Sequence, residues 1–95
     1  MDAAVATVLT QTITESRSVC FGGEVPFLIY DAKRNVIEAL SGMGAAPQLA
    51  TAEWYRKNKE GKIPREDPAG AAVPAVFHTC LTGLDRCGTM TFAEA

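Results

Sequence analysis

The side chains best suited to chemistry in this sequence are a single histidine and two cysteines near the C-terminal end. His78 stands two residues before Cys80, and Cys87 follows seven residues later. A histidine beside a thiol can activate a cysteine nucleophile, and thiols with an imidazole also bind zinc. On a helix, however, residues two apart point in different directions, and the spacings match no common zinc pattern. The sequence therefore predicts a partly exposed helix histidine, with no catalytic residue and no metal site.

The three cysteines, Cys20, Cys80 and Cys87, are an odd number and cannot form a complete disulfide framework. Seven residues of helix separate the Cα atoms of Cys80 and Cys87 by roughly 10 Å. A disulfide needs a separation of less than about 7 Å. We therefore expect free thiols that act mainly as small core residues.

One carboxylate follows a pair of glycines and precedes an apolar run. Gly22 and Gly23 could cradle a phosphate, but that motif requires a following helix, and here a strand follows. The pair predicts a tight turn instead. Glu24 could act as a general acid or base, or as a structural carboxylate at the rim of a site, and the second interpretation is favoured. Residues 57–62 and 65–67 mix positive and negative charges, which is typical of a solvated loop.

Composition limits the possible partners. The chain has 95 residues, of which 47% are hydrophobic and 21% charged, and its net charge is −2. No basic surface argues for nucleic acid or an anionic membrane. No apolar run is long enough to span a bilayer, and no basic n-region precedes an apolar stretch as in a signal peptide. The length suits a single segment with a modest core.

Elements of alternating type must position these side chains. A helix is predicted over 2–16, with Asp2 as its N-cap and an apolar stripe of Val5, Val8, Leu9, Thr12 and Ile13. A strand over 25–30 is apolar throughout, which predicts burial on both faces, with Pro26 at its start or on an edge. A connection of hairpin length, 31–35, leads to an antiparallel strand over 36–40. Residues 41–44 then break the pattern.

The second half of the sequence is mainly helix and loop. Thr51 is expected to cap a short helix over 51–57 that packs Trp54 and Tyr55 onto the sheet, and 58–70 is expected to be a surface loop. Pro74 suits the first turn of another helix, and Gly88 suits a left-handed residue after it. The predicted buried stripe of this helix consists of Val76, Phe77, Cys80, Leu81 and Leu84.

The last residues have the spacing of a capping box, with Thr91 as the cap and Glu94 three residues later. This motif predicts the start of a helix, but the sequence ends one residue later. At the other end, Met1 abuts the first helix directly. We therefore expect residues 1–95 to be a single segment truncated at both ends.

Four segments in order resemble the large subunit of γ-glutamyltransferase-like (γ-glutamyltranspeptidase) enzymes, near its N-terminus. They are the first helix, the glycine turn with its strand, the next strand with its small-residue loop, and the Val-Pro helix leading into Gly-Thr. In this sequence they are 1–6, 20–32, 40–51 and 73–94. Together they cover most of the chain, although Ala75, Cys87 and Cys20 depart from residues usual in the family.

The resemblance implies an N-terminal-nucleophile (Ntn) hydrolase with an α/β (α+β) fold. The chain would be part of an αββα sandwich, contributing a β-hairpin and flanking helices. In such enzymes a threonine exposed by self-cleavage attacks an amide, with its own α-amine as base. That threonine belongs to the small subunit, so this chain would be scaffold beside the rest of the large subunit and the small subunit. No cofactor is implied, and the substrate would be a small γ-glutamyl or related acyl amide such as glutathione.

One departure concerns the substrate. In these enzymes an arginine in the loop after the second strand grips the donor's α-carboxylate, because a guanidinium offers two parallel donors. Depending on the alignment, that position is Met43 or Ala45, and neither side chain can do this. Two alternatives stay open beside the enzyme interpretation: a small non-enzymatic α/β binding module, and a family member whose parent protein is inactive.

Overall fold

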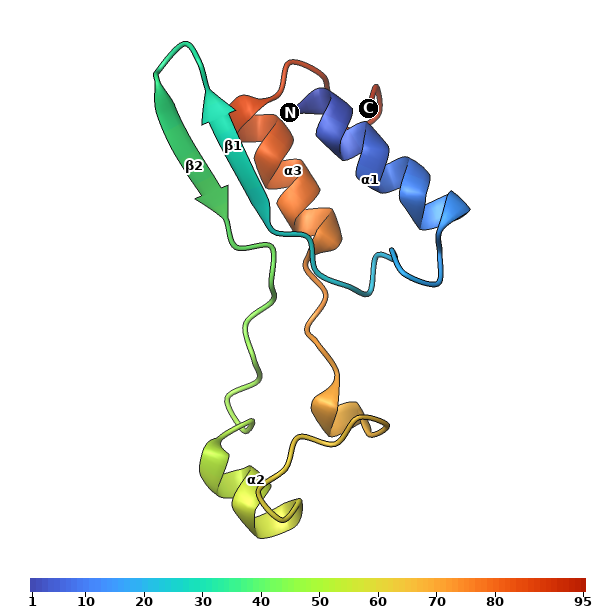
Figure 1. Ribbon diagram of the computed structural model, residues 1–95, viewed down its shortest axis with the longest axis vertical. Helices are drawn as coiled ribbons and strands as arrows, with labels where there is room; N and C mark the ends of the chain where they lie inside the picture. Colours follow the sequence, from blue (N-terminus) through green and yellow to red (C-terminus); the bar gives the residue numbers. More distant parts are fainter.

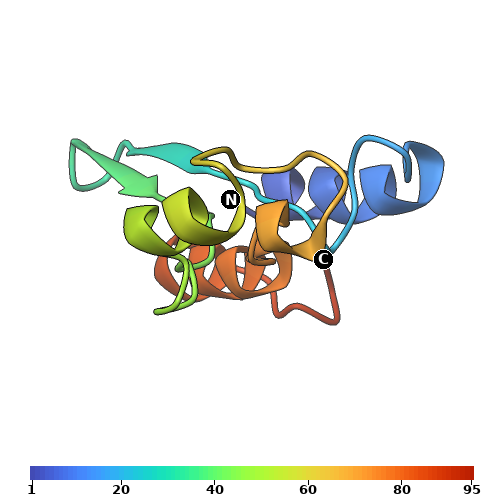
Figure 2. The ribbon, with the colours of Figure 1, turned by 90° about the horizontal axis from the view of Figure 1, so that it is seen from below.

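The computed structural model describes all residues, 1–95, and shows a mixed α/β fold with a two-stranded antiparallel sheet, which confirms the predicted fold class. Its elements in chain order are α1 (Asp2–Thr14), β1 (Phe27–Asp31), β2 (Val36–Leu40), α2 (Ala52–Asn58), the 3-10 turn η1 (Pro68–Gly70) and α3 (Val76–Cys87). Figure 1 shows an upper body of α1, the hairpin and α3, and a separate α2 lobe made of α2, η1 and the loop between them. Two connecting segments, 41–50 and 71–75, join the lobe to the body. The molecule measures 50 × 31 × 16 Å, and Figure 2 shows how flat it is.

The hairpin forms where the sequence predicts it. β1 and β2 pair antiparallel, with Phe27 opposite Leu40 and Asp31 opposite Val36. In the turn, the Asp31 carboxylate accepts hydrogen bonds from the backbone N–H groups of Lys33 and Arg34 at 2.8 and 3.1 Å. A short side chain that bonds its own turn in this way favours the reversal. Pro26 lies immediately before β1, as expected for a residue that lacks a ladder donor.

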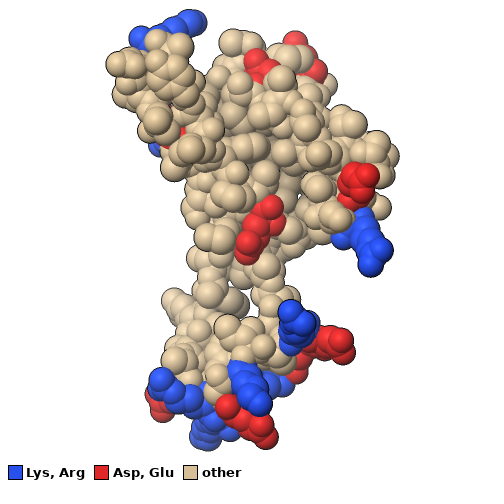
Figure 3. Space-filling view, viewed as in Figure 1, with Lys and Arg blue, Asp and Glu red and all other residues tan.

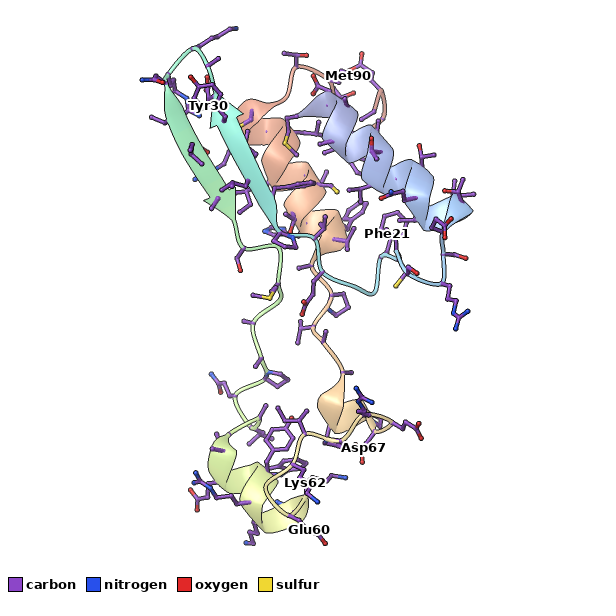
Figure 4. All side chains as sticks on the ribbon, in the orientation of Figure 1. Phe21, Tyr30, Glu60, Lys62, Asp67 and Met90 are labelled. Carbon is purple, nitrogen blue, oxygen red and sulfur yellow. The ribbon has the colours of Figure 1, made fainter.

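The predicted burial of β1 on both faces is wrong. Leu28 is 78% exposed and Tyr30 62% exposed, and Figure 4 shows Tyr30 on the hairpin, away from the α2 lobe. Phe27, which points to the opposite face, packs against the core between the helices. The alternation arises because the sheet has two strands and α3 covers it from one side only. An apolar run therefore indicated a strand here without indicating how many layers cover it.

A small core joins α1 to α3. Val5 and Val8 of α1 meet Val76, Cys80 and Leu84 of α3, and all five side chains are buried. Only nine of the 95 residues are buried, so burial of apolar surface contributes little to the free energy of folding. The C-terminal end of the predicted apolar stripe of α1 is not part of the core, since Ile13 is exposed.

The predicted buried stripe of α3 is correct at three positions and wrong at two. Phe77 is 50% exposed and Leu81 is exposed as well, whereas Thr79 and Gly83 are buried. Phe77 instead makes edge-to-face contacts with Phe21 and Phe92, at ring-centroid distances of 6.2 and 4.9 Å. Figure 4 shows Phe21 on the loop after α1, close to the start of α3. The aromatic cluster thus lies beside the core and ties the loop after α1 to α3.

Two predictions about helix ends are wrong. Pro74 precedes α3 rather than lying in its first turn, because Ala75 is the cap residue. Gly88 is extended, with φ −89°, rather than left-handed. A glycine is still required there, because a Cβ atom would lie 2.7 Å from both the Asp2 Oδ1 and the Leu84 carbonyl oxygen. The requirement comes from close approach and not from backbone conformation.

Asp2 was predicted to cap α1, but Met1 occupies the cap position. Asp2 is the first helical residue, and its carboxylate instead accepts hydrogen bonds from the segment after α3. The backbone N–H and the hydroxyl of Thr89 donate at 2.9 and 2.6 Å, and the N–H of Met90 donates at 3.2 Å. These bonds, first the Thr89 hydroxyl and then the Thr89 N–H, hold the pKa of the Asp2 carboxyl below its usual range.

Asp2→Asn is expected to destabilise the chain at neutral pH and to have no effect in acid. Because the folded-state pKa is depressed, the stabilisation is fully present above the ordinary aspartate pKa of 3.8 and is lost as pH falls through the folded-state value. The measurement is thermal unfolding of both proteins between neutral and acidic pH. Asp85→Asn is the matched control, since Asp85 is an exposed carboxylate in no hydrogen bond or ion pair. A difference between wild type and Asp2→Asn that persists at the acid end would contradict the role given to the charge.

The helix α2 begins with the predicted cap residue, but it does not pack where the sequence predicts. The Thr51 hydroxyl accepts a hydrogen bond from the Trp54 N–H at 3.1 Å, which confirms the cap. Trp54 and Tyr55 do not pack α2 onto the sheet, because the connecting segments hold α2 away from it. Residues 58–70 form a loop, as predicted, with η1 at its end.

One half of the capping box predicted at Thr91 and Glu94 is confirmed, because the Glu94 carboxylate accepts a hydrogen bond from the Thr91 N–H at 2.8 Å.

None of the helices is long and apolar enough to cross a membrane.

Candidate functional site

A cavity lies between the two connecting segments, where the upper body gives way to the α2 lobe. Its volume is about 520 Å³, within the range of roughly 300–1,000 Å³ usual for small-molecule sites. Nine of the thirteen lining residues are hydrophobic. The lining residues are Glu24, Gly44, Ala46, Pro47, Leu49, Ala50, Trp54, Tyr55, Pro68, Ala69, Ala71, Ala72 and Val73.

Backbone contacts close the cavity toward the upper body. The Gly44 N–H donates to the Val73 carbonyl at 3.1 Å and joins the two connecting segments. A Cβ atom on Gly44 would lie 2.4 Å from Val73 Cγ1, so the segments can approach this closely only with glycine at 44. The glycine turn supports both segments, because Ala75 N–H donates to the Gly23 carbonyl and Val25 N–H to the Gly42 carbonyl. The pair Gly22–Gly23 therefore forms the predicted tight turn, and it places Glu24 at the cavity.

Two aromatic residues of α2 form the opposite wall. The rings of Trp54 and Tyr55 meet edge to face, with centroids 5.1 Å apart. The Tyr55 hydroxyl donates to the Ala69 carbonyl, which fixes the η1 segment against α2. An ion pair of 2.5 Å between Lys59 Nζ and Asp67 Oδ2 tightens the same loop, and the ammonium group lowers the pKa of the Asp67 carboxyl.

The charge at the cavity is a single carboxylate. Glu24 is the only charged residue of the lining. It is exposed and takes part in no hydrogen bond or ion pair, as expected for a carboxylate at a rim. Figure 3 shows the largest group of charged side chains over the α2 lobe, where Figure 4 places Glu60, Lys62 and Asp67. The connecting region is largely uncharged by comparison.

No arginine lines the cavity. Arg34 is engaged at the hairpin, where its guanidinium binds the carboxylates of Asp31 and Glu38 at 2.6 and 2.5 Å. Arg86 also contacts Glu38, at 3.6 Å. The carboxylates hold the pKa of Arg34 above its usual range.

The two positions predicted to replace a carboxylate-binding arginine flank the cavity wall. Met43 is 58% exposed and Ala45 is exposed. Neither lines the cavity, but Gly44 between them and Ala46 after them do. A longer side chain at position 43 or 45 would therefore extend from the same backbone segment that forms this wall of the cavity.

The histidine and the cysteines do not form a site. His78 is exposed and Cys80 is fully buried in the core, with no hydrogen bond between them. Burial raises the pKa of the Cys80 thiol, which disfavours the nucleophilic thiolate. All three cysteines are free, as predicted, although Cys20 is exposed and only Cys80 is a core residue. No three His, Cys, Asp or Glu side chains converge as metal ligands would.

The sequence did not predict the cavity, although some of its lining belongs to segments that the sequence had marked. The small-residue loop after β2 and Glu24 were singled out, and both contribute to the lining. Trp54 and Tyr55 were expected to pack on the sheet, and the segment from Pro68 to Val73 was not singled out, because no local pattern shows that segments distant in sequence meet here. The one available signal was the pair of aromatic residues on a helix too short to bury them by itself.

Comparison with known families gives the class of the protein. The family model for gamma-glutamyltranspeptidases matches residues 1–95, the whole chain. The chain therefore belongs to the gamma-glutamyltranspeptidase family, as its resemblance predicted. Membership implies a multi-subunit enzyme that acts on small substrates. A search of solved structures gave no match.

Proposed function

We propose that this chain is a structural part of the large subunit of an Ntn hydrolase that transfers acyl groups from amide donors to amines or water. The observation that carries the proposal is the family match over 1–95. The acyl donor would be a γ-glutamyl compound such as glutathione or a related amide, and the catalytic threonine would come from the small subunit. The chain itself would supply scaffold and one wall of the substrate pocket.

The exposed sheet supports a place in a larger assembly. β1 and β2 have no further strand on either side, and Leu28, Tyr30 and Ile37 are exposed. An unpaired edge and an apolar face favour association with more protein. In an αββα sandwich, further strands and a second sheet would cover both. The remainder of the large subunit and the small subunit are the proposed partners.

The chemistry of the chain supports a scaffold role. The Cys80 thiol is buried and its pKa is raised, and no base lies within hydrogen-bonding distance of it. The exposed carboxylate Glu24 accepts no hydrogen bond from a hydroxyl or thiol. Acyl transfer needs a nucleophile with an aligned base, so the proposed reaction depends on groups outside residues 1–95.

The purified 95-residue chain is expected to release no chromophore from γ-glutamyl or other acyl anilides. The reason is that no nucleophile with an aligned base is present within it. The test compares the chain with the full natural protein on the same anilides, and turnover by the full protein alone supports the proposal. Turnover by the chain that survives purification and disappears in His78→Ala or Cys80→Ala would overturn it. Absence of turnover by the full protein would favour the inactive family member.

A further inference from the structure

We propose that the cavity between the connecting segments binds a small organic ammonium ion, with Glu24 pairing with the ammonium group and the apolar wall holding its hydrocarbon part. The inference does not rest on the proposed acyl transfer, because it concerns binding to residues of this chain. It rests on the charge, the apolar lining and the size of the cavity.

The charge of the cavity is uncompensated. Glu24 is the one charged residue among thirteen that line it, and the carboxylate has no ion-pair or hydrogen-bond partner. Lys59 of the α2 lobe is not available to balance it, because its ammonium group is paired with Asp67 at 2.5 Å. A ligand that fills the cavity would displace water from the carboxylate, and a charge removed from water is costly unless it is paired. A cationic group on the ligand supplies that pair.

The remaining wall suits an apolar body attached to that cation. Pro47, Leu49 and several alanines line the cavity beside the rings of Trp54 and Tyr55. Aromatic faces attract ammonium groups. The Tyr55 hydroxyl already donates to the Ala69 carbonyl, so its proton is not free for a ligand. The volume of about 520 Å³ accommodates a compact ligand.

The same features disfavour other ligand classes. No lysine, arginine or histidine lines the cavity, so a carboxylate or phosphate would meet Glu24 without a balancing cation. A neutral apolar molecule would contact the wall but would leave the carboxylate unpaired. The expected order of affinity is therefore cation, then neutral molecule, then anion.

Three probes of one skeleton test this order: 2-phenylethylammonium, 2-phenylethanol and 3-phenylpropionate. Each is titrated calorimetrically into the protein, in unaltered form and as Glu24→Gln. The ammonium is expected to bind about tenfold more tightly than the alcohol, as one charge-assisted hydrogen bond would give. Glu24→Gln is expected to abolish this preference and to leave the alcohol unchanged. Glu53→Gln is the matched control, because it removes the same charge from α2 outside the cavity lining.

Trp54 is the single tryptophan of residues 1–95 and lines the cavity, so it also reports the position of binding. The fluorescence change caused by the ammonium should disappear in Trp54→Phe. The proposal is overturned if ammonium and alcohol bind equally, if Glu24→Gln retains the preference, or if no probe binds at millimolar concentration. If Glu24→Gln also weakens binding of the alcohol, the affinities of both probes for the unaltered protein are measured at increasing salt concentration. A loss of affinity for the ammonium alone supports the ion pair, because salt screens charges. An ammonium affinity that does not depend on salt overturns the proposal. Because none of these titrations requires turnover, failure here is distinct from failure of the proposed acyl transfer.

Discussion

Replacing Gly42 by alanine is expected to lower the free energy of unfolding by about 3 kcal/mol, the upper part of the usual range for single substitutions. Gly42 is buried with φ +63°, a conformation that costs a residue with a side chain about 1–2 kcal/mol. A Cβ atom there would lie 2.1 Å from the Val25 carbonyl oxygen and 2.6 Å from the Pro26 nitrogen. Since both of these neighbouring atoms belong to the backbone, the clash can be relieved only by moving the start of β1 away from the segment after β2. That movement would break the 3.0 Å hydrogen bond from Val25 N–H to the Gly42 carbonyl.

Gly61→Ala is the matched control for this substitution. Gly61 also has a positive φ, +76°, but its Cβ would meet only Arg56 Cγ at 3.8 Å. Its expected cost is therefore the conformational part alone, about 1 kcal/mol. Urea unfolding followed by far-UV circular dichroism measures both. Equal losses at the two positions would show that the close approach between Gly42 and Val25 contributes nothing.

The second large effect concerns substrate preference and rests on the proposed function. The full protein, if active, is expected to favour γ-glutamyl donors weakly or not at all, because under that proposal Met43 or Ala45 takes the position of the arginine that binds the donor's α-carboxylate. No other arginine of the chain lines the cavity beside this loop. A charge-assisted hydrogen bond contributes roughly 1.5–3 kcal/mol, and each 1.4 kcal/mol is about tenfold in an equilibrium constant. A preference lower by one to two decades follows from the missing contact.

The measurement compares kcat/KM of the full protein for a γ-glutamyl anilide and for the matching anilide without the α-carboxylate. Ala45→Arg and Met43→Arg are each tested, and one of them should raise the preference for the γ-glutamyl compound. Gln48→Arg places the same charge in the same exposed segment and serves as the control for a general electrostatic effect. A strong γ-glutamyl preference in the unaltered protein would contradict the interpretation of this loop.

Local patterns predicted the elements and the family. The turn between β1 and β2 follows from Asp31, whose short carboxylate bonds the next backbone N–H groups, and the start of α2 follows from the Thr51 hydroxyl. The glycine turn at 22–23 and the break at 41–44 were likewise visible, because they depend on residues adjacent in sequence. The order of these motifs also indicated the gamma-glutamyltranspeptidase family, which the family match confirms.

Contacts between distant residues were decided by the tertiary structure alone. Asp2 has the residue type of a helix cap, yet its carboxylate binds Thr89, because α1 and α3 pack with these two ends together. Phe77 has the spacing of a core residue, yet it packs on Phe21 and Phe92 beside the core. Trp54 and Tyr55 line a cavity and do not cover the sheet, because two connecting segments carry α2 away from the body. The sequence by itself thus determined the local turns, caps and strands, whose energies depend on neighbouring residues. The cavity and the position of Glu24 at it depend on how segments tens of residues apart approach one another, and only the folded chain decides that.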